Sequence, residues 1–404
     1  MRLQIPGSEL IVDIGTRKQL FVDDYIIETT RWIVPRLAET ARWVQPPART
    51  RTDLDGWSEA TNKIEGDVPG HLLRATAFVT RNLNQPERYE GNPIMQRAHP
   101  WEGKSAPHPT DIMYDEEDGI WKMWYLGVTV DEFPERKIVY NSMYATSEDG
   151  ISWERPTLGV VKDRNGNDTN IVNECKGQFV VKDKNADPSR RYKMGHGPLL
   201  HWNPPIEATI YHSPDGIHWT PDPGPTQSDR GDETLSIMYD PVSRKYIGFC
   251  RNVYPEPWLT HRTERSTQRM QSNDLIHWSI SAPIIDKDPL DPFDTDFYGL
   301  QGMYYESMYL GFLNIHRAGP DHMEVWLSHS RDSFHWERIR TGPFLPRGSD
   351  GSWEWGMAQM FQAPMRVGDE LWLYYTGVAG LHDGGDSAAG LGLAKLRLDG
   401  FVSI

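Results

Sequence analysis

Acidic residues stand just before several short apolar segments of this sequence. The strongest candidates for chemistry are Asp111, Asp232, Glu233 and Asp296. Carboxyl groups that are crowded together acquire different pKa values, so that one stays protonated while another stays ionised. Such a pair can cleave a glycosidic bond, because one group protonates the leaving oxygen and the other acts as base or nucleophile. These residues therefore predict general acid and base chemistry on a glycoside, provided that the fold brings them together.

The expected roles of the four acids follow from their positions. Either Asp232 or Glu233 is the expected proton donor, and Asp111 or Asp296 is the expected base or nucleophile. Retaining and inverting enzymes differ in carboxyl separation, roughly 5–5.5 Å against 6.5–9.5 Å, which the sequence does not give. Because aspartate is also common in turns and at strand starts, a structural role is the alternative for each acid.

Other polar and aromatic residues near the same segments are candidates for binding a substrate. Basic side chains on second strands can clamp hydroxyl groups or an anion, or they can simply neutralise neighbouring acids. Aromatic rings can stack on a sugar, although core packing is the usual role of a single ring. The candidates for substrate binding are His108, Arg251, Tyr298, His316, Arg317, Glu354 and Trp355.

A short signature recurs along the chain and predicts how these candidates are positioned. It reads SEDGISW at 147–153 and SPDGIHW at 213–219, with related copies at 272–278 and 330–336. The copies share Ser, Asp and Trp in register, with a period of about sixty residues. Asp-Gly favours a tight turn, and the Trp can pack between neighbouring sheets. Self-similarity at this period predicts a repeat architecture.

The segments between the signatures predict strands. Second strands of each unit are expected at 121–125, 192–194, 246–249, 309–312 and 371–375, and the first strands precede them at 112–114, 179–181, 236–239, 302–305 and 363–366. Five such units predict an all-β fold, a five-bladed β-propeller with four antiparallel strands per blade. Residues before the first strand of each blade would then gather at one mouth of the axis.

The N-terminal residues lack the repeat. Residues 1–90 are predicted to form a strand at 19–27 and a loop or lid that close the propeller. Residues 91–404 are predicted to form the propeller itself, as the catalytic part of a single domain. A strand over the seam would also cover an open sheet edge.

Several motifs resemble a known group of proteins. They are LFVDDYIIE at 20–28, KMWY at 122–125, DFYG at 296–299, LRLDGFVSI at 396–404 and the repeated turns. Together they resemble bacterial proteins that are similar to the N-terminal domain of glycoside hydrolase family 32, within the wider set that includes family 43. That set contains invertases, arabinofuranosidases and mannoside phosphorylases. The resemblance implies acidic residues at the central end of a five-bladed propeller.

The sequence departs from the better-known members of this set in its first blade. The arabinofuranosidases carry an Asp-Pro-Ser type motif there, and the nearest segment here is His108-Pro109-Thr110. Either His108 replaces an acid at this point, or Asp111 takes over its role. The roles of that family are therefore not transferred residue by residue.

The bulk composition excludes several classes of partner. The net charge of −15 argues against nucleic acid and anionic membranes. The sequence contains no apolar run long enough to span a membrane. The first residues also lack the pattern of a secretory signal, so a cytoplasmic location is expected. The two cysteines predict neither a disulfide framework nor a zinc site. No cofactor is expected to be required, although an oxygen-rich axis would suit calcium.

These observations predict a glycoside hydrolase that removes a terminal furanoside or pyranoside from a small glycoside or oligosaccharide. A glycoside phosphorylase on the same fold is one alternative, and it would need basic side chains such as Arg251, His316 and Arg317 beside the acids. A non-catalytic carbohydrate-binding propeller is the other alternative, and it would not need paired acids. In each case the expected partner is a carbohydrate.

Overall fold

The computed structural model divides the chain into two units, residues 84–401 and residues 1–83 with 402–404. The structure describes residues 2–4, 11–13, 20, 42–43, 64–65, 82–103, 107–131, 137–196, 206–222, 226–228, 235–255, 263–279, 282–382 and 388–403. The strand expected at 19–27 lies outside the described residues except for the buried Leu20.

Short antiparallel pairs are the described elements of the unit that contains the N-terminus. The pairs are β1 (Arg2–Gln4) with β2 (Ile11–Asp13), β3 (Arg42–Trp43) with β4 (Ile64–Glu65), and β5 (Asn82–Leu83) with β29 (Val402–Ser403).

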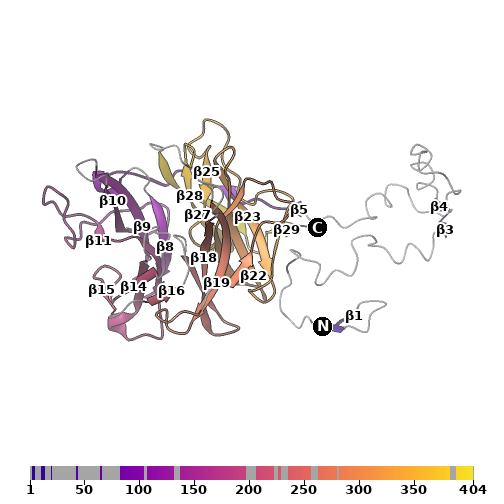
Figure 1. The fold of residues 1–404 in the computed structure, drawn as a ribbon, viewed down its shortest axis with the longest axis horizontal. Helices are drawn as coiled ribbons and strands as arrows, with labels where there is room; N and C mark the ends of the chain where they lie inside the picture. The colour runs from indigo at the N-terminus through magenta and orange to yellow at the C-terminus, as the bar shows by residue number, and fades with distance from the viewer. Residues whose placement is uncertain are drawn as a thin grey trace. The chain divides into compact units, whose positions relative to one another are not determined.

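The unit 84–401 is built from antiparallel groups of strands that follow one another along the chain (Figure 1). The first group contains β8 (His108–Asp115), β9 (Ile120–Asp131), β10 (Lys137–Ser147) and β11 (Ile171–Asn173). The second contains β12 (Gly177–Lys182), β13 (Tyr192–His196), β14 (Ile206–Ser213), β15 (Thr220–Pro221) and β16 (Thr226–Ser228). The third contains β17 (Leu235–Asp240), β18 (Lys245–Pro255), β19 (Thr263–Ser272) and β20 (Ala282–Ile285).

The last two groups share one continuous sheet. The fourth contains β21 (Thr295–Tyr305), β22 (Met308–Arg317), β23 (His322–Ser330) and β24 (Trp336–Arg338). The fifth contains β25 (Met357–Gln359), β26 (Met365–Val367), β27 (Glu370–Val378) and β28 (Ala389–Arg397). Within the described residues there is no α-helix, only 3₁₀ turns at Pro100–Glu102 and Pro188–Arg190. The predicted all-β, propeller-like class is thereby confirmed.

Strands from the five groups surround a common axis. The first strands β8, β12, β17 and β21 contact one another in this order, and β27 of the fifth group contacts β8. Neighbouring groups cover the faces of the inner strands, so that these strands are largely buried. In β22, the second strand of the fourth group, nine of the ten residues are buried. The starts of strands far apart in sequence therefore meet at one end of the axis.

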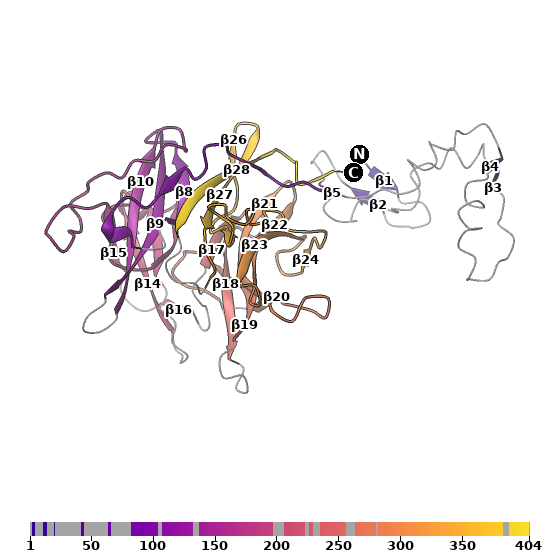
Figure 2. The same cartoon turned by 90° about the horizontal axis from the view of Figure 1, so that it is seen from above.

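The fifth group takes its outer strands from the beginning of this unit. Strands β6 (Glu87–Arg88) and β7 (Met95–Gln96) both pair with β28, and this part of the chain runs beside the yellow β28 (Figure 2). The Arg88 guanidinium also binds the buried Glu354 carboxylate, with Nε and Oε1 2.6 Å apart. Joining the two ends of the unit in one sheet removes an exposed sheet edge.

Each signature forms the same turn after the third strand of its group. In the first copy, the Ser147 hydroxyl accepts hydrogen bonds from the backbone N–H groups of Asp149 and Gly150. The Asp149 carboxylate accepts from the N–H groups of Ile151 and Ser152. The copies at 213–219, 272–278 and 330–336 repeat these bonds. The signature acids therefore have a structural role in these turns.

The second turn is also held by the preceding group, and this gives a prediction about stability. The Trp124 indole donates a hydrogen bond to the Gly216 carbonyl at 2.7 Å, and a Cβ at Gly216 would lie 2.4 Å from the Trp124 ring. Gly216 also has a φ of +80°. We expect Gly216→Ala to lower the free energy of unfolding by about 1–3 kcal/mol. Thermal and urea unfolding measure this change.

Gly166→Ala is the matched control, because Gly166 has a similar φ of +82° but a Cβ there would meet nothing within 4 Å. It should cost about 1 kcal/mol, the price of the backbone conformation alone. Equal losses in the two variants would show that the close approach to Trp124 contributes nothing to the destabilisation of Gly216→Ala.

Candidate functional site

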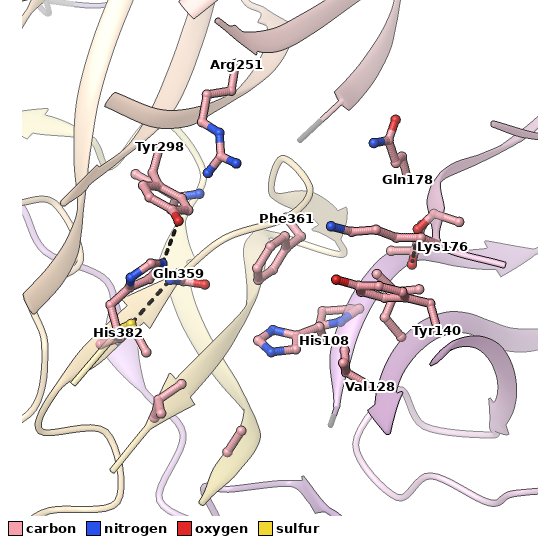
Figure 3. Close-up of a pocket in the computed structure, with 18 of the residues that line it drawn as sticks. His108, Val128, Tyr140, Lys176, Gln178, Arg251, Tyr298, Gln359, Phe361 and His382 are labelled. Atoms are coloured by element: carbon pink, nitrogen blue, oxygen red, sulfur yellow. Dashed lines mark hydrogen bonds between the residues drawn. The ribbon is translucent and has the colours of Figure 1, made fainter. Parts of the chain in front are cut away.

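A cavity of about 460 Å³ lies at the end of the axis where the starts of the first strands meet. Its wall is made by residues from all the strand groups, including His108 at the start of β8 and Lys176 just before β12 (Figure 3). Arg251 in β18, Tyr298 in β21 and Gln359 in β25 complete the circle. This volume is typical of a pocket for a small molecule.

The wall of this axial cavity is polar, aromatic and cationic. Amides are supplied by Gln178, Gln301, Asn314 and Gln359, and aromatic rings by Tyr140, Tyr298 and Phe361. Arg251 and Lys176 bring positive charge, and no described lining residue is a carboxylate. Amides and rings are suited to hydroxyl groups and sugar faces, and the cations are suited to an anionic group.

Two arginine side chains lie over the Tyr298 ring. The Arg251 guanidinium lies 4.2 Å and that of Arg265 lies 4.9 Å from the ring centroid. The Tyr298 hydroxyl contacts Nε2 of His382 at 2.5 Å (Figure 3). These contacts hold the ring and both guanidinium groups in fixed positions beside the cavity.

The opposite side of the cavity contains His108, Lys176 and Tyr140 (Figure 3). The Lys176 ammonium lies 4.9 Å from the centroid of the Tyr140 ring. Burial, together with the positive charge of Lys176, lowers the pKa of His108 to about 4. The imidazole of His108 is therefore neutral at pH 7, so that it binds as a hydrogen-bonding group and not as a cation.

Asp296 lies beside Tyr298, although it is not part of the cavity wall. Its Oδ2 accepts a hydrogen bond from Nη1 of Arg265 at 2.9 Å and lies 3.9 Å from Nδ1 of His316. Burial opposes ionisation of this carboxyl, but the positive charge of Arg265 and the hydrogen bonds from its guanidinium and backbone N–H outweigh it and lower the pKa of Asp296. An ionised carboxylate is thus held in place close to the cavity.

Asp111 borders a different space from the one that contains Arg251. It lines a second cavity of about 420 Å³, which shares Thr110 and Phe361 with the axial cavity. Burial raises the pKa of Asp111 to about 8, although backbone N–H groups of Val180 and Ile112 partly oppose the shift. Asp111 is therefore protonated at pH 7, which suits a proton donor better than the base or nucleophile expected from the sequence.

The other predicted residues lie in several places. Asp232 and Glu233 fall outside the described residues. Arg317 pairs with Asp294, and Glu354 pairs with Arg88, so neither side chain lines the axial cavity. Trp355 packs edge-on against His322 and is not part of the wall. Of the seven predicted binding residues, the wall contains His108, Arg251 and Tyr298.

His316 belongs to a cluster of potential metal ligands behind Tyr298. Its Nε2 lies 2.9 Å from Oδ1 of Asp321, and Nδ1 of His382 lies 4.0 Å from the same oxygen. One ligand atom from each residue lies within 4.8 Å of the others. This is the one such group found among the described residues.

Some residues of the site were missed by sequence reasoning. Lys176 stands just before the first strand of its group, the kind of position that was predicted to place acidic residues in the site. His382 lies in the loop beyond β27, whereas Arg251 and His316 lie within β18 and β22. The same positional rule, applied to every residue type, would have found Lys176 but not His382. Arg265, on a third strand, carries no comparable sequence signal.

Comparisons with known proteins identify the fold. No family model and no curated protein matches the sequence. A putative glycosidase from Bacteroides thetaiotaomicron VPI-5482 aligns with TM-score 0.52 and 17% identity over 76% of this chain and 96% of that chain. A β-1,2-mannobiose phosphorylase from Listeria innocua, in complex with β-1,2-mannobiose, aligns with TM-score 0.52 and 14% identity over 77% and 96%.

A third similar structure is that of an enzyme named for a different reaction on a sugar. It is an N-acetylgalactosamine deacetylase from F. plautii in complex with blood group B trisaccharide, with TM-score 0.51 and 15% identity over 78% of this chain and 95% of that chain. At these identities the likeness establishes a shared, glycosidase-like fold and no shared activity. The narrower resemblance to families 32 and 43 stays a prediction.

Among the described residues, no helix is long and apolar enough to cross a bilayer.

Proposed function

We propose that the protein cleaves a glycosidic bond of a small glycoside bound in the axial cavity. The observation that supports this most is the composition of the cavity wall, where amides, aromatic rings and two cations surround a space of about 460 Å³. Sugars are bound by such a combination, since ring faces pack on aromatic groups and hydroxyl groups need several hydrogen-bond partners.

Hydrolysis is the reaction that we propose first. Asp232 or Glu233, just before β17, would protonate the leaving oxygen, and Asp296 would act as base from its position beside Tyr298. The protonated Asp111 is a second candidate for the proton donor. Arg251 would hold hydroxyl or anionic groups of the substrate, because its guanidinium is fixed against the Tyr298 ring.

Phosphorolysis is the second candidate, and one observation favours it. Arg251 and Lys176 face the same cavity, and the described part of its wall contains no carboxylate. Two cations are suited to a phosphate that attacks in place of water. Arg317, which was expected to contribute, pairs with Asp294 instead.

An activity screen with one variant tests both candidates. Nitrophenyl glycosides and short oligosaccharides are offered to the wild-type protein with and without inorganic phosphate, and free sugar and sugar phosphate are measured. We expect Arg251→Ala to lower kcat/KM by about 10–100-fold, because a charged hydrogen bond in the cavity is lost. In a hydrolase the loss is independent of phosphate, whereas in a phosphorylase the KM for phosphate rises.

Arg366→Ala is the control variant, because Arg366 is exposed on β26 and does not line the cavity. Its kcat/KM should equal that of the wild type. Full activity of Arg251→Ala on a substrate that the wild type cleaves would place the reaction outside this cavity.

A further inference from the structure

His316, Asp321 and His382 are brought together by loops of two strand groups. His316 is near the end of β22, and Asp321 lies in the turn that follows, with a φ of +59°. His382 lies in the loop after β27, and its backbone N–H donates to the carbonyl oxygen of Asp321 at 3.3 Å. The turn and the loop are thus joined by main-chain contact, which fixes the three side chains relative to one another.

The separations of the potential ligand atoms fit a single small cation. The Asp321 Oδ1 atom lies 2.9 Å from Nε2 of His316 and 4.0 Å from Nδ1 of His382. Ligands at about 2.0–2.2 Å from a tetrahedral zinc ion are about 3.3 Å apart. Because the two observed separations lie on either side of this value, small side-chain movements would complete the site.

The outer nitrogen of each imidazole faces an oxygen. Nε2 of His382 contacts the Tyr298 hydroxyl at 2.5 Å, and Nδ1 of His316 faces Oδ2 of Asp296 at 3.9 Å. Metal-binding histidines usually donate their second N–H to such a partner. Asp296 is itself held by Arg265 at 2.9 Å. The cluster therefore has both the inner ligands and the outer oxygen partners of a metal site.

One buried atom supports this assignment independently. His316 is 4% exposed, and its Nδ1 has no hydrogen-bond partner. When Nε2 carries the hydrogen and donates to Asp321, Nδ1 presents a lone pair toward the Asp296 carboxylate, which is unfavourable. A cation on Nε2 would place the hydrogen on Nδ1, where it can donate toward Asp296. Metal binding would thus turn an N–H group, in place of a lone pair, toward the Asp296 carboxylate, and a small approach from 3.9 Å would complete a hydrogen bond.

We propose that His316, Asp321 and His382 bind one divalent transition-metal ion, such as Zn²⁺ or Mn²⁺, at the wall of the axial cavity. Two imidazoles and one carboxylate suit these ions, whereas Ca²⁺ takes oxygen ligands. Three protein ligands leave coordination positions open, as in catalytic metal sites. Tyr298 and His382 line the cavity, so the open positions are next to the space where a ligand would bind. The binding site does not depend on which reaction the protein catalyses.

Metal binding by the full-length protein tests the proposal without any substrate. The purified protein is stripped with a chelator and titrated with ZnCl₂ and MnCl₂ by calorimetry, and CoCl₂ is followed by visible absorption. We expect one equivalent of metal to bind, with the absorption of four- or five-coordinate Co²⁺. Asp321→Asn and His382→Gln should each weaken binding at least about 100-fold, and Asp296→Asn about 10–100-fold.

The control is His335→Gln, because His335 also pairs with an aspartate, at 2.6 Å, but in an exposed signature turn. It should bind metal like the wild type. Thermal unfolding without metal shows whether each variant is folded, and the Co²⁺ spectrum of the wild type tests the site even if a variant does not fold. Absence of stoichiometric binding in the wild type, or equal affinity in Asp321→Asn and His382→Gln, would overturn the proposal and leave a hydrogen-bonded His–Asp cluster.

Discussion

Asp115→Asn is expected to lower the free energy of unfolding by about 3–5 kcal/mol at pH 7. The Asp115 carboxylate is fully buried and binds the ammonium groups of Lys122 and Lys182 at 2.8 and 2.7 Å. It also accepts a hydrogen bond from the Tyr192 hydroxyl at 2.5 Å. An asparagine would leave the buried Lys122 and the partly buried Lys182 without their main counter-charge and turn an N–H group toward them. Urea unfolding at pH 7 measures the loss.

Asp240→Asn is the matched control, because Asp240 ends β17 as Asp115 ends β8 and also accepts from a tyrosine of the next group, Tyr309. Its other partners are the backbone N–H groups of Val242 and Ser243 and the Ser243 hydroxyl, with no lysine among them. We expect a loss of about 1–2 kcal/mol. Equal losses in the two variants would mean that the buried lysines contribute nothing to the difference.

Ionisation of the Asp115 carboxyl also makes the free energy of unfolding depend on pH. Burial alone would raise the pKa of Asp115, but hydrogen bonds from Lys122, Lys182 and Tyr192 lower it well below its usual range. A lowered pKa contributes stability above the unfolded value of about 3.9, and that stability is lost as the pH falls below it. We therefore expect the difference between wild type and Asp115→Asn to begin to shrink below about pH 5 and to go on shrinking below pH 3, until the pH reaches the lowered pKa of the folded state.

Asp111→Asn is expected to have the opposite effect and to stabilise the protein at neutral and alkaline pH. The pKa of Asp111 is raised to about 8 by burial, and an unfolded aspartate has a pKa of about 3.9. The stability contributed by a raised pKa is fully present below pH 4 and is lost as the pH rises toward 8. A neutral amide avoids this loss, so we expect a gain of about 2–4 kcal/mol at pH 8 and almost none at pH 4.

Unfolding of the wild type and Asp111→Asn at pH 4, 6 and 8 measures this dependence. Asp149→Asn provides a contrast of opposite sign, because backbone N–H groups in the first signature turn lower the pKa of Asp149 to about 2. That variant should lose stability above pH 4. A pH-independent difference between Asp111→Asn and the wild type would show that the Asp111 carboxyl is ionised and solvated in the folded state.

The sequence alone was sufficient for the elements that depend on local chemistry. The signature turns were predictable, because Ser147 and Asp149 bond to backbone groups within a few residues. The strands before and after them followed from apolar runs and from the period. Three of the predicted binding residues, His108, Arg251 and Tyr298, line the axial cavity, and their role in binding stays a prediction.

Only the tertiary structure decided which partner each polar side chain takes, because partners come from distant segments. Glu354 was a candidate for the site, yet the pairing of β6 with β28 gives it Arg88 as a partner. Arg317 pairs with Asp294 because the antiparallel pairing of β21 with β22 places Thr295 opposite Arg317. Asp111 looked like a base, but its burial, which has no sequence signal, raises its pKa.

The three proposed metal ligands also show what the sequence determines and what only the tertiary structure determines. The sequence contains His316 and Asp321 five residues apart, which by itself predicts no site. His382 joins them because the loop after β27 meets the turn after β22, and Asp296 and Tyr298 reach the two imidazoles from β21. The sequence determines the type of each side chain. Its ionisation state and its binding partner depend on charges and hydrogen-bond donors that only folding brings within a few ångströms.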